Sequence, residues 1–293
     1  MSAISHKLGQ QNRRVKLREA GFKGLLLGCL GISILLLGVL LVDVAIDGAS
    51  SVDVGFITDY PSSVSKNAGV RAALLGTVWL MGVVTLFIVP VGVATALYLE
   101  EYADRDRWWN RAIEVNIQNL AAVPSIVYGI LGLAFLVRGP FDLGNVVLAG
   151  GLTLGLLVLP VVIIAGREAI RAVPPSIREG SMALGATQWQ TIWRQVLPAA
   201  IPGIATGVIL ALSRAIGETA PLIVIGAAVN PRFNPDGLGS AFTALPIQIF
   251  AWTTDKDREF VDLAAAAILV MMVVLLLMNS VAIYLRNRYE QKW

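Results

Sequence analysis

The chain has 293 residues, of which 56% are apolar and 15% are charged, and its formal net charge is +3. Soluble domains carry about 25% charged residues, so this chain has too little charge to cover a soluble surface of its size. Its single Cys (Cys29) excludes an internal disulfide, and its single His (His6) excludes a metal site built from several histidines. The apolar residues come in long runs, which predicts an all-α polytopic membrane protein.

Six segments are long and apolar enough to cross a bilayer, which takes about 20 residues each. In chain order they run from about Gly24 to Val42, Ala72 to Leu99, Leu120 to Val137, Val146 to Ala165, Ala199 to Val229, and Leu263 to Leu285. The first could be a signal peptide, because basic residues precede it. Its apolar run is longer than the usual 7–15 residues and no small-residue cleavage site follows, so we expect a retained helix.

The distribution of Lys and Arg predicts the orientation of these spans. Sixteen of them fall on the side of both termini and five on the other side. Cytoplasmic loops carry the excess of positive charge, so both termini are predicted to be cytoplasmic, with the N-terminal tail near membrane lipid. The expected organisation is an N-terminal tail (1–22), a first span with its outer loop (23–69), a main membrane domain (70–285) and a C-terminal tail (286–293).

Several sequence motifs of catalysis are missing. The chain has no G-x-x-x-x-G-K-[ST] loop, no G-x-S-x-G and no H-E-x-x-H. We therefore expect no catalytic residue, no metal site and no nucleotide bound by this chain. If the protein moves a solute uphill, the energy comes from an ion gradient or from a partner.

The longest inner loop, residues 166–198, has a helix–turn–helix pattern. Ser176 precedes Glu179 by three residues, which is the spacing of a capping box. Gly185 permits a sharp turn, and Thr187 can cap a second short helix over 188–196. This element is either an interfacial helix that anchors the loop or a docking knob for a cytoplasmic partner, and the pattern leaves both open.

The same loop resembles the EAA loop of ABC importer permeases, whose pattern is E-A-A-x3-G-x9-I-x-L-P. Glu179, Gly185 and Leu197-Pro198 match it in identity and spacing, while Gln195 stands in place of the family's Ile. In such permeases the loop fits a groove on the ATPase subunit. The resemblance therefore implies a set of ATPase-coupling residues, namely Glu179, Gly180, Ser181, Ala183 and Gly185.

A charged pair interrupts the fifth predicted span. An ionisable residue at mid-bilayer costs about 2.5–3.5 kcal/mol, so it normally faces the bundle or water. Arg214 and Glu218 are four residues apart, which allows them to pair on one helical face. The pair is either structural or part of a substrate site. A guanidinium suits an oxyanion, and the neighbouring carboxylate would favour a substrate that still carries a proton.

Two further segments resemble phosphate-importer permeases of the PstA type: S-R-A-I-G-E-T-A-P-L from Ser213 to Leu222, and V-P-S-I-V-Y-G-I from Val123 to Ile130. The resemblance implies that residues 70–285 form a type I ABC importer permease core, also called MetI-like, with about six transmembrane helices. The substrate-pathway residues that it implies are Arg214, Glu218, Ser213, Thr219 and Ser125.

By the same resemblance, the chain would form half of a phosphate passage in a bacterial cytoplasmic (inner) membrane. Its partners would be a homologous permease of the PstC type, an ATPase dimer that uses ATP and Mg, and a periplasmic phosphate-binding protein; no nucleic acid is expected. The alternatives are a permease for another oxyanion or small solute of the same class, a secondary transporter or channel without an ATPase, and a membrane scaffold or sensor. The EAA-like loop has no role in a secondary transporter or channel, and a scaffold or sensor leaves Arg214 within the fifth predicted span unexplained.

Overall fold

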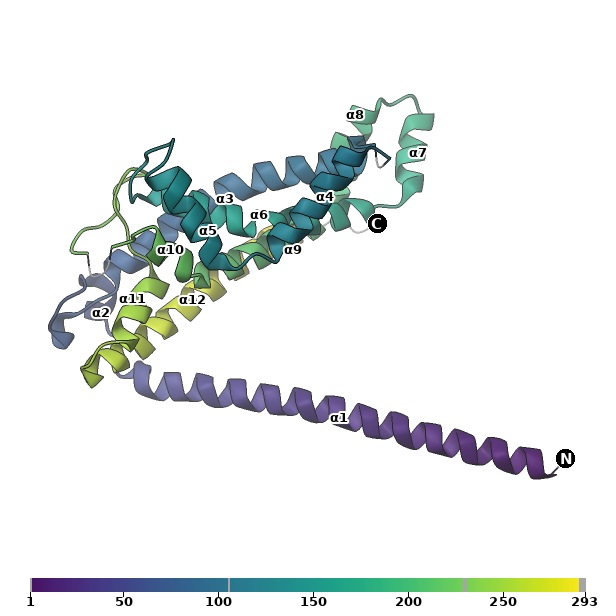
Figure 1. The fold of residues 1–293 in the computed structure, drawn as a ribbon, viewed down its shortest axis with the longest axis horizontal. Helices are drawn as coiled ribbons and strands as arrows, with labels where there is room; N and C mark the ends of the chain where they lie inside the picture. The colour runs from purple at the N-terminus through teal and green to yellow at the C-terminus, as the bar shows by residue number, and fades with distance from the viewer. Residues whose placement is uncertain (1, 105, 229–230, 290–293) are drawn as a thin grey trace.

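The computed structural model describes residues 2–104, 106–228 and 231–289, and these residues form helices and connecting loops without a β-strand (Figure 1). The long helices are α1 (Ser2–Ala49), α3 (Arg71–Leu97), α6 (Val147–Arg171), α9 (Leu197–Gly217) and α12 (Arg258–Tyr289). The shorter α-helices are α2 (Val54–Thr58), α4 (Trp108–Ala121), α5 (Ser125–Gly132), α7 (Pro175–Ala183), α8 (Gln188–Thr191), α10 (Ala220–Val224) and α11 (Leu245–Thr253). The predicted all-α membrane fold is confirmed.

Single turns of other helix types complete the fold. A 3-10 turn, η1, covers Ser65–Asn67. Three π-turns extend or join α-helices: η2 (Tyr98–Tyr102), η3 (Leu133–Val137) and η4 (Ile192–Val196).

Five helices of the described chain are long and apolar enough to span a membrane, and a bent pair of helices makes a sixth. The bent pair is the third predicted span, which is not one straight helix. Its two parts, Trp108–Ala121 and Ser125–Val137, meet at an angle of 106°. Pro124 explains the break, because a proline disfavours the helical conformation of the residue before it.

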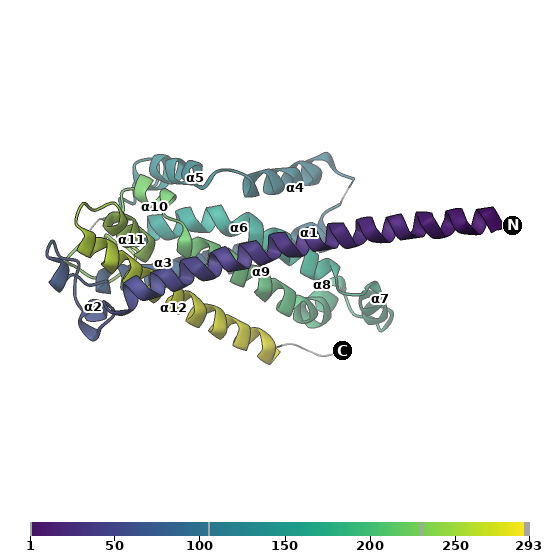
Figure 2. The ribbon, with the colours of Figure 1, turned by 90° about the horizontal axis from the view of Figure 1, so that it is seen from below.

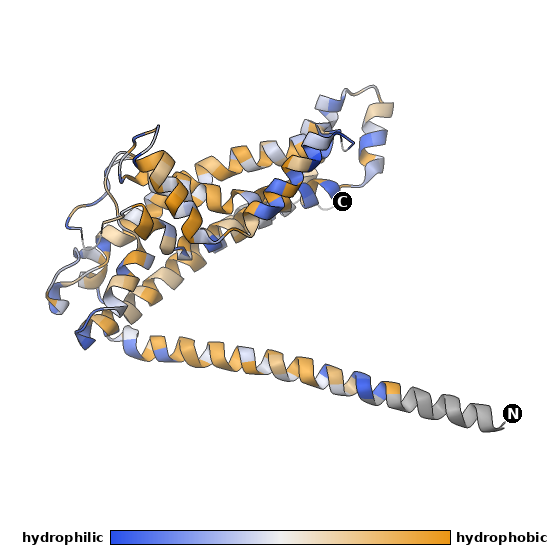
Figure 3. Ribbon diagram, in the orientation of Figure 1, coloured by the Kyte–Doolittle hydropathy of each residue, from blue (hydrophilic) through white to orange (hydrophobic). Residues whose placement is uncertain are grey.

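The first helix stands away from the rest of the bundle (Figures 1 and 2). None of its most apolar window is buried, and large hydrophobic residues between Leu25 and Val42 are exposed along it (Figure 3). Its last turn packs closely on α12, where a Cβ at Gly48 would lie 2.6 Å from the backbone of Ala265. A uniformly apolar surface is what a helix inside a bilayer presents.

The remaining long helices form one packed bundle, with α6 at its centre. Fifteen residues of α6 are buried, including the small residues Gly151 and Gly155. A Cβ at Gly151 would lie 2.5 Å from Val83, and one at Gly155 would lie 2.6 Å from Phe87. Small residues therefore let α3 approach α6 closely, as in other membrane bundles.

Residues 242–253 fold into the bundle, although the sequence predicts only a connection between the spans Ala199–Val229 and Leu263–Leu285 in this part of the chain. Phe242 is buried against Gly150 of α6, and the Leu245 amide donates to the Thr77 hydroxyl of α3 at 2.9 Å. This segment includes α11, whose Trp252 is also buried. The apolar runs of this segment are interrupted by turn residues, and each run is too short to be recognised as a span. The sequence pattern therefore missed this element.

The two ends of the bundle carry different elements (Figures 1 and 2). One end carries α7 and α8, and α1 begins and α12 finishes toward it. The other end carries α2, α11 and the connections around them.

Candidate functional site

The fifth predicted span is broken where its charged residues lie. The α9 helix ends at Gly217, Glu218 is extended (φ −77°, ψ 115°), and α10 begins at Ala220. The fifth predicted span is therefore not one continuous helix, because α9 ends at the charged pair that interrupts it. Gly217 and Pro221 explain the break, because glycine favours helix ends and proline favours the first turn of a new helix.

Arg214 and Glu218 pair across the end of α9. Arg214 Nε lies 3.4 Å from Glu218 Oε1, and the two side chains are 41% and 18% exposed. The predicted pair is confirmed, but Glu218 lies beyond the helix rather than on its face. A single long contact with this exposure leaves the guanidinium partly accessible, and a cation in the last turn of a helix is electrostatically favourable.

Ser213 and Thr219, the neighbours of this pair in the sequence, contact other parts of the bundle. The Ser213 hydroxyl donates to Asn279 Oδ1 of α12 at 2.9 Å, which ties α9 to α12. Thr219 lines a mainly apolar cleft of about 450 Å³ between the break, α11 and α12. The sequence did not indicate Asn279, although a polar residue inside the sixth predicted span was the available signal.

A second break lies beside the first. Ser125 is the first residue of α5, directly after the break at Pro124, and the Tyr128 hydroxyl donates to the Leu120 carbonyl of α4 at 2.8 Å. The α5 helix packs on α10, since a Cβ at Gly129 would lie 2.7 Å from Pro221 Cα. Irregular backbone at membrane depth is tolerated where it is buried in protein or lines a water-filled cavity.

The inner loop forms the predicted helix–turn–helix. Gly185 has φ +87°, a conformation that L side chains rarely adopt, and it turns the chain between α7 and α8. Thr187 caps α8 in a capping box with Gln190. The predicted capping box at Ser176 and Glu179 is absent; α7 begins instead at Pro175, because proline suits the first helical position.

The second helix of this loop is not separate from the fifth span. The π-turn η4 joins α8 to α9, so that Gln188–Gly217 is one span of 30 residues. The Leu197 amide bonds to the Ile192 carbonyl, five residues back, directly before Pro198. The helix therefore continues through Pro198, whereas the sequence predicts a short helix over 188–196 and a separate span from about Ala199.

The loop presents its predicted coupling residues to solvent. Glu179, Gly180, Ala183 and Gly185 are exposed, whereas Ser181 is partly buried and lies 2.9 Å, hydroxyl to hydroxyl, from Thr191. Leu184 at the tip is 91% exposed. Met182 and Trp189 of the same loop are also exposed, and a group of large apolar side chains in solvent indicates a contact surface.

We expect Thr187→Ala to loosen the start of α8. The substitution removes the side-chain acceptor of the Gln190 amide, and the loss of an N-cap costs about 1 kcal/mol. Hydrogen exchange of the Gln190 amide should therefore be about fivefold faster in the variant. Thr187→Ser keeps the acceptor and should exchange like the wild type; equal rates in all three proteins would contradict the capping role.

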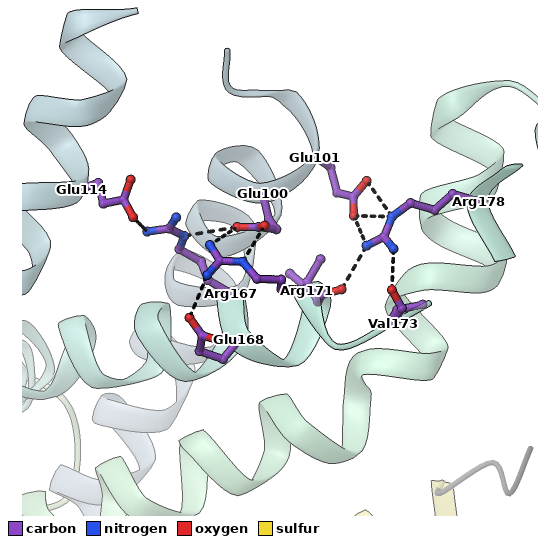
Figure 4. Close-up of polar contacts among 9 residues, drawn as sticks. Glu100, Glu101, Glu114, Arg167, Glu168, Arg171, Val173 and Arg178 are labelled. Atoms are coloured by element: carbon purple, nitrogen blue, oxygen red, sulfur yellow. Dashed lines mark hydrogen bonds and ion pairs between the residues drawn. The ribbon is translucent and has the colours of Figure 1, made fainter. Parts of the chain in front are cut away.

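An ion-pair network lies at the base of the loop (Figure 4). Glu100 of η2 is buried, with only 4% of its side chain exposed, and it pairs with Arg167 at 3.5 Å and with Arg171 at 3.0 Å. Arg167 also pairs with Glu114 of α4 at 2.9 Å. The pairing of these arginines depends on residues 53 to 71 positions away, which no spacing rule reveals.

Together, the membrane helices, the paired helix breaks with an accessible arginine, and the protruding loop define a membrane transport subunit. Residues 88–292 match the family "Binding-protein-dependent transport system inner membrane component". This match covers more than half of the chain, so the chain belongs to this family of importer permeases. It is a transport permease subunit with a type I importer fold.

Several relatives of the chain carry names from phosphate transport. The chain is 38% identical to "Phosphate transport system permease protein PstA 1" of Mycobacterium tuberculosis (strain ATCC 25618 / H37Rv), over 64% of this chain and 60% of that protein. It is 30% identical to PstA of Haemophilus influenzae, over 75% and 76%. It is 33% identical to "Probable ABC transporter permease protein YqgI" of Bacillus subtilis, over 70% and 69%.

Solved importers share the fold at lower identity. A bacterial alginate ABC transporter in complex with its alginate-bound periplasmic protein superposes with a TM-score of 0.69 at 18% identity, covering 94% of this chain and 96% of that chain. The inward-facing methionine transporter MetNI gives a TM-score of 0.60 at 15% identity, covering 76% and 96%. At this identity the likeness establishes the architecture alone.

Proposed function

We propose that this chain is one of two permease subunits of an ATP-driven phosphate importer. The observation that carries the proposal is the accessible guanidinium of Arg214, which lies where α9 breaks. Relatives named PstA at 30–38% identity support phosphate as the substrate. A relative named PstC, from Haemophilus influenzae, is 28% identical, which favours the PstA type for this chain.

In this function Arg214 binds the oxyanion as it passes between the two permeases. A guanidinium offers several fixed donors to a tetrahedral oxyanion. Glu218 holds the guanidinium in place when no substrate is bound, and its carboxylate accepts a hydrogen bond from the P–OH group of hydrogen phosphate, which keeps its proton. Ser125 and Thr219, at the starts of the two short helices, offer hydroxyls along the same passage, while Ser213 fixes α9 against α12.

The loop of α7 and α8 docks on an ATPase subunit in this function. Glu179, Gly180, Ser181 and Ala183 lie on α7, and Gly185 sets the turn that follows. ATP and Mg are bound and hydrolysed by the ATPase dimer. A homologous permease completes the passage, and a periplasmic phosphate-binding protein delivers the substrate.

The proposed location is the bacterial cytoplasmic membrane, with both termini and the α7–α8 loop on the cytoplasmic side. The excess of Lys and Arg on that side supports this orientation. The proposed organisation has a cytoplasmic N-terminal tail over 1–22, a first span and periplasmic loop over 23–69, the permease domain over 70–285, and a cytoplasmic C-terminal tail over 286–293. The family match over 88–292 falls largely within the third part.

Uptake of radiolabelled phosphate by proteoliposomes containing the complete co-expressed complex tests the proposal. We expect uptake that requires ATP inside the vesicles and is not inhibited by excess sulfate. Inhibition by sulfate would indicate that the natural substrate is another oxyanion. Phosphate uptake that continues without ATP would contradict the importer mechanism.

A further inference from the structure

Arg178 of α7 joins the loop to η2, the π-turn that continues α3 into one helical span, Arg71–Tyr102, and so forms the end of α3. Its Nη2 lies 2.7 Å from Glu101 Oε1, and its Nε donates to the same oxygen at 3.1 Å (Figure 4). The two side chains are only 21% and 9% exposed. A forked contact with little exposure is held more firmly than a surface ion pair, and removing one partner from it leaves an uncompensated charge.

The same guanidinium also holds the end of α6. Arg178 Nη1 donates to the Val173 carbonyl at 2.7 Å, and Nη2 donates to the Ile170 carbonyl at 2.9 Å. The last carbonyls of a helix have no partner within the helix, so a basic side chain can satisfy them. One side chain on α7 therefore contacts both α3 and α6.

The second helix of the loop is tied to the same residue. Gln188 Nε2 of α8 donates to the Glu101 carbonyl at 2.8 Å. Ser181 of α7 meets Thr191 of α8, which cross-links the two helices of the loop. Side chain and backbone of Glu101 thus bind the two arms of one cross-linked unit.

These contacts give the loop a connection that the chain itself does not supply. Along the chain, α7 follows α6 through a short turn that includes Pro174, and α8 continues into α9. Neither covalent path leads to α3. Besides the packing of α6 on α3, the contacts of Glu101 are a direct link by which a displacement of the loop reaches α3.

We propose that Glu101 and Arg178 form a strut that makes α3 move with the α7–α8 loop when the ATPase closes. The proposal rests on the proposed function, in which this loop docks on the ATPase. Both are positioning residues: neither touches the substrate or the nucleotide. The strut makes the loop, the end of α3 and the end of α6 move as one body.

The test compares Glu101→Gln and Arg178→Gln in the complete transporter. We measure phosphate taken up per ATP hydrolysed, because a residue that only stabilises the fold lowers both rates together. We expect this ratio to fall about fivefold or more in each variant while ATP hydrolysis continues. The double variant should fall no further, because both single changes interrupt one link.

Glu168→Gln is the matched control. Glu168 lies on the same end of α6, is exposed, and pairs with Arg171 rather than with Arg178. Its ratio should equal that of the wild type. Arg178→Lys keeps the charge without the forked geometry and should be intermediate; it also carries the test if the glutamine variants do not assemble. The strut would be overturned if the assembled glutamine variants take up as much phosphate per ATP hydrolysed as the wild type. If only Arg178→Lys assembles, a wild-type ratio in that variant would overturn it.

A distance measurement tests the strut without any transported substrate. Nitroxide labels at Tyr102 and Trp189, both exposed, report the separation of the end of α3 from α8 in a Cys29→Ser background. With the strut intact, this distance should stay the same when ATP closes the complex, and it should change in the double glutamine variant. If ATP changes this distance in the protein that retains Glu101 and Arg178, the inference is overturned. Failure of wild-type phosphate uptake would instead contradict only the proposed substrate.

Discussion

Arg214→Gln is expected to reduce ATP-driven phosphate uptake by about 10- to 100-fold. Hydrogen bonds to charged groups contribute about 1.5–3 kcal/mol, which corresponds to that range of rate or affinity. The substitution removes the positive charge but keeps a polar side chain of moderate size. Because Arg214 is half exposed at the end of α9 and pairs only through one long contact, the fold should tolerate the change.

The measurement is uptake by the reconstituted complex, with Arg232→Gln as the control. Arg232 is an exposed arginine of the segment that follows α10, and its substitution should leave uptake unchanged. Arg214→Lys should retain part of the activity, since an ammonium keeps the charge but not the fixed donors. Normal uptake by Arg214→Gln would show that the charge of Arg214 has a structural role and does not bind the substrate.

Glu218 provides a separate test of substrate choice. If its carboxylate accepts a hydrogen bond from the P–OH group of hydrogen phosphate, which sulfate lacks, Glu218→Gln should weaken the discrimination of phosphate against sulfate. Unchanged discrimination in a transporting variant would exclude that role and leave Glu218 as a holder of Arg214.

Gly76→Ala is expected to destabilise the whole bundle. A Cβ at Gly76 would overlap the Thr243 carbonyl oxygen and lie 3.1 Å from the carbonyl carbon. Both sides of this contact are backbone, so no side-chain rotation relieves it. Overpacking costs about 1–3 kcal/mol or more, and here it separates α3 from the segment that leads into α11.

The thermal midpoint of the purified protein in detergent measures this effect, with Gly82→Ala as the control on the same helix. Nothing lies within 4 Å of a Cβ at Gly82, so that change should be neutral or stabilising. A lower midpoint for Gly76→Ala alone confirms the close approach of α3 to residue 243. Equal midpoints for the two variants would contradict it.

The amino-acid sequence alone determined the class of the protein and the positions of its long helices. An apolar run as long as a bilayer is thick specifies a membrane-spanning helix whichever helices it packs against. Lipid can surround its apolar side chains, and its backbone hydrogen bonds lie within the helix. Local chemistry also sufficed for the loop: Gly185 and Thr187 act through their own backbone and near neighbours. The pairing of Arg214 with Glu218 was predictable for the same reason, since the two residues are four apart.

Only the tertiary structure decided how the helix breaks and the charges come together. The α5–α10 contact joins Gly129 to Pro221, and the strut joins Glu101 to Arg178, 77 residues further along the chain. The folding of α11 into the bundle likewise depends on a hydrogen bond from Leu245 to Thr77. Spacing patterns describe one helix at a time. Contacts between distant segments depend on how helices pack, and that is set by side-chain shape across the whole bundle.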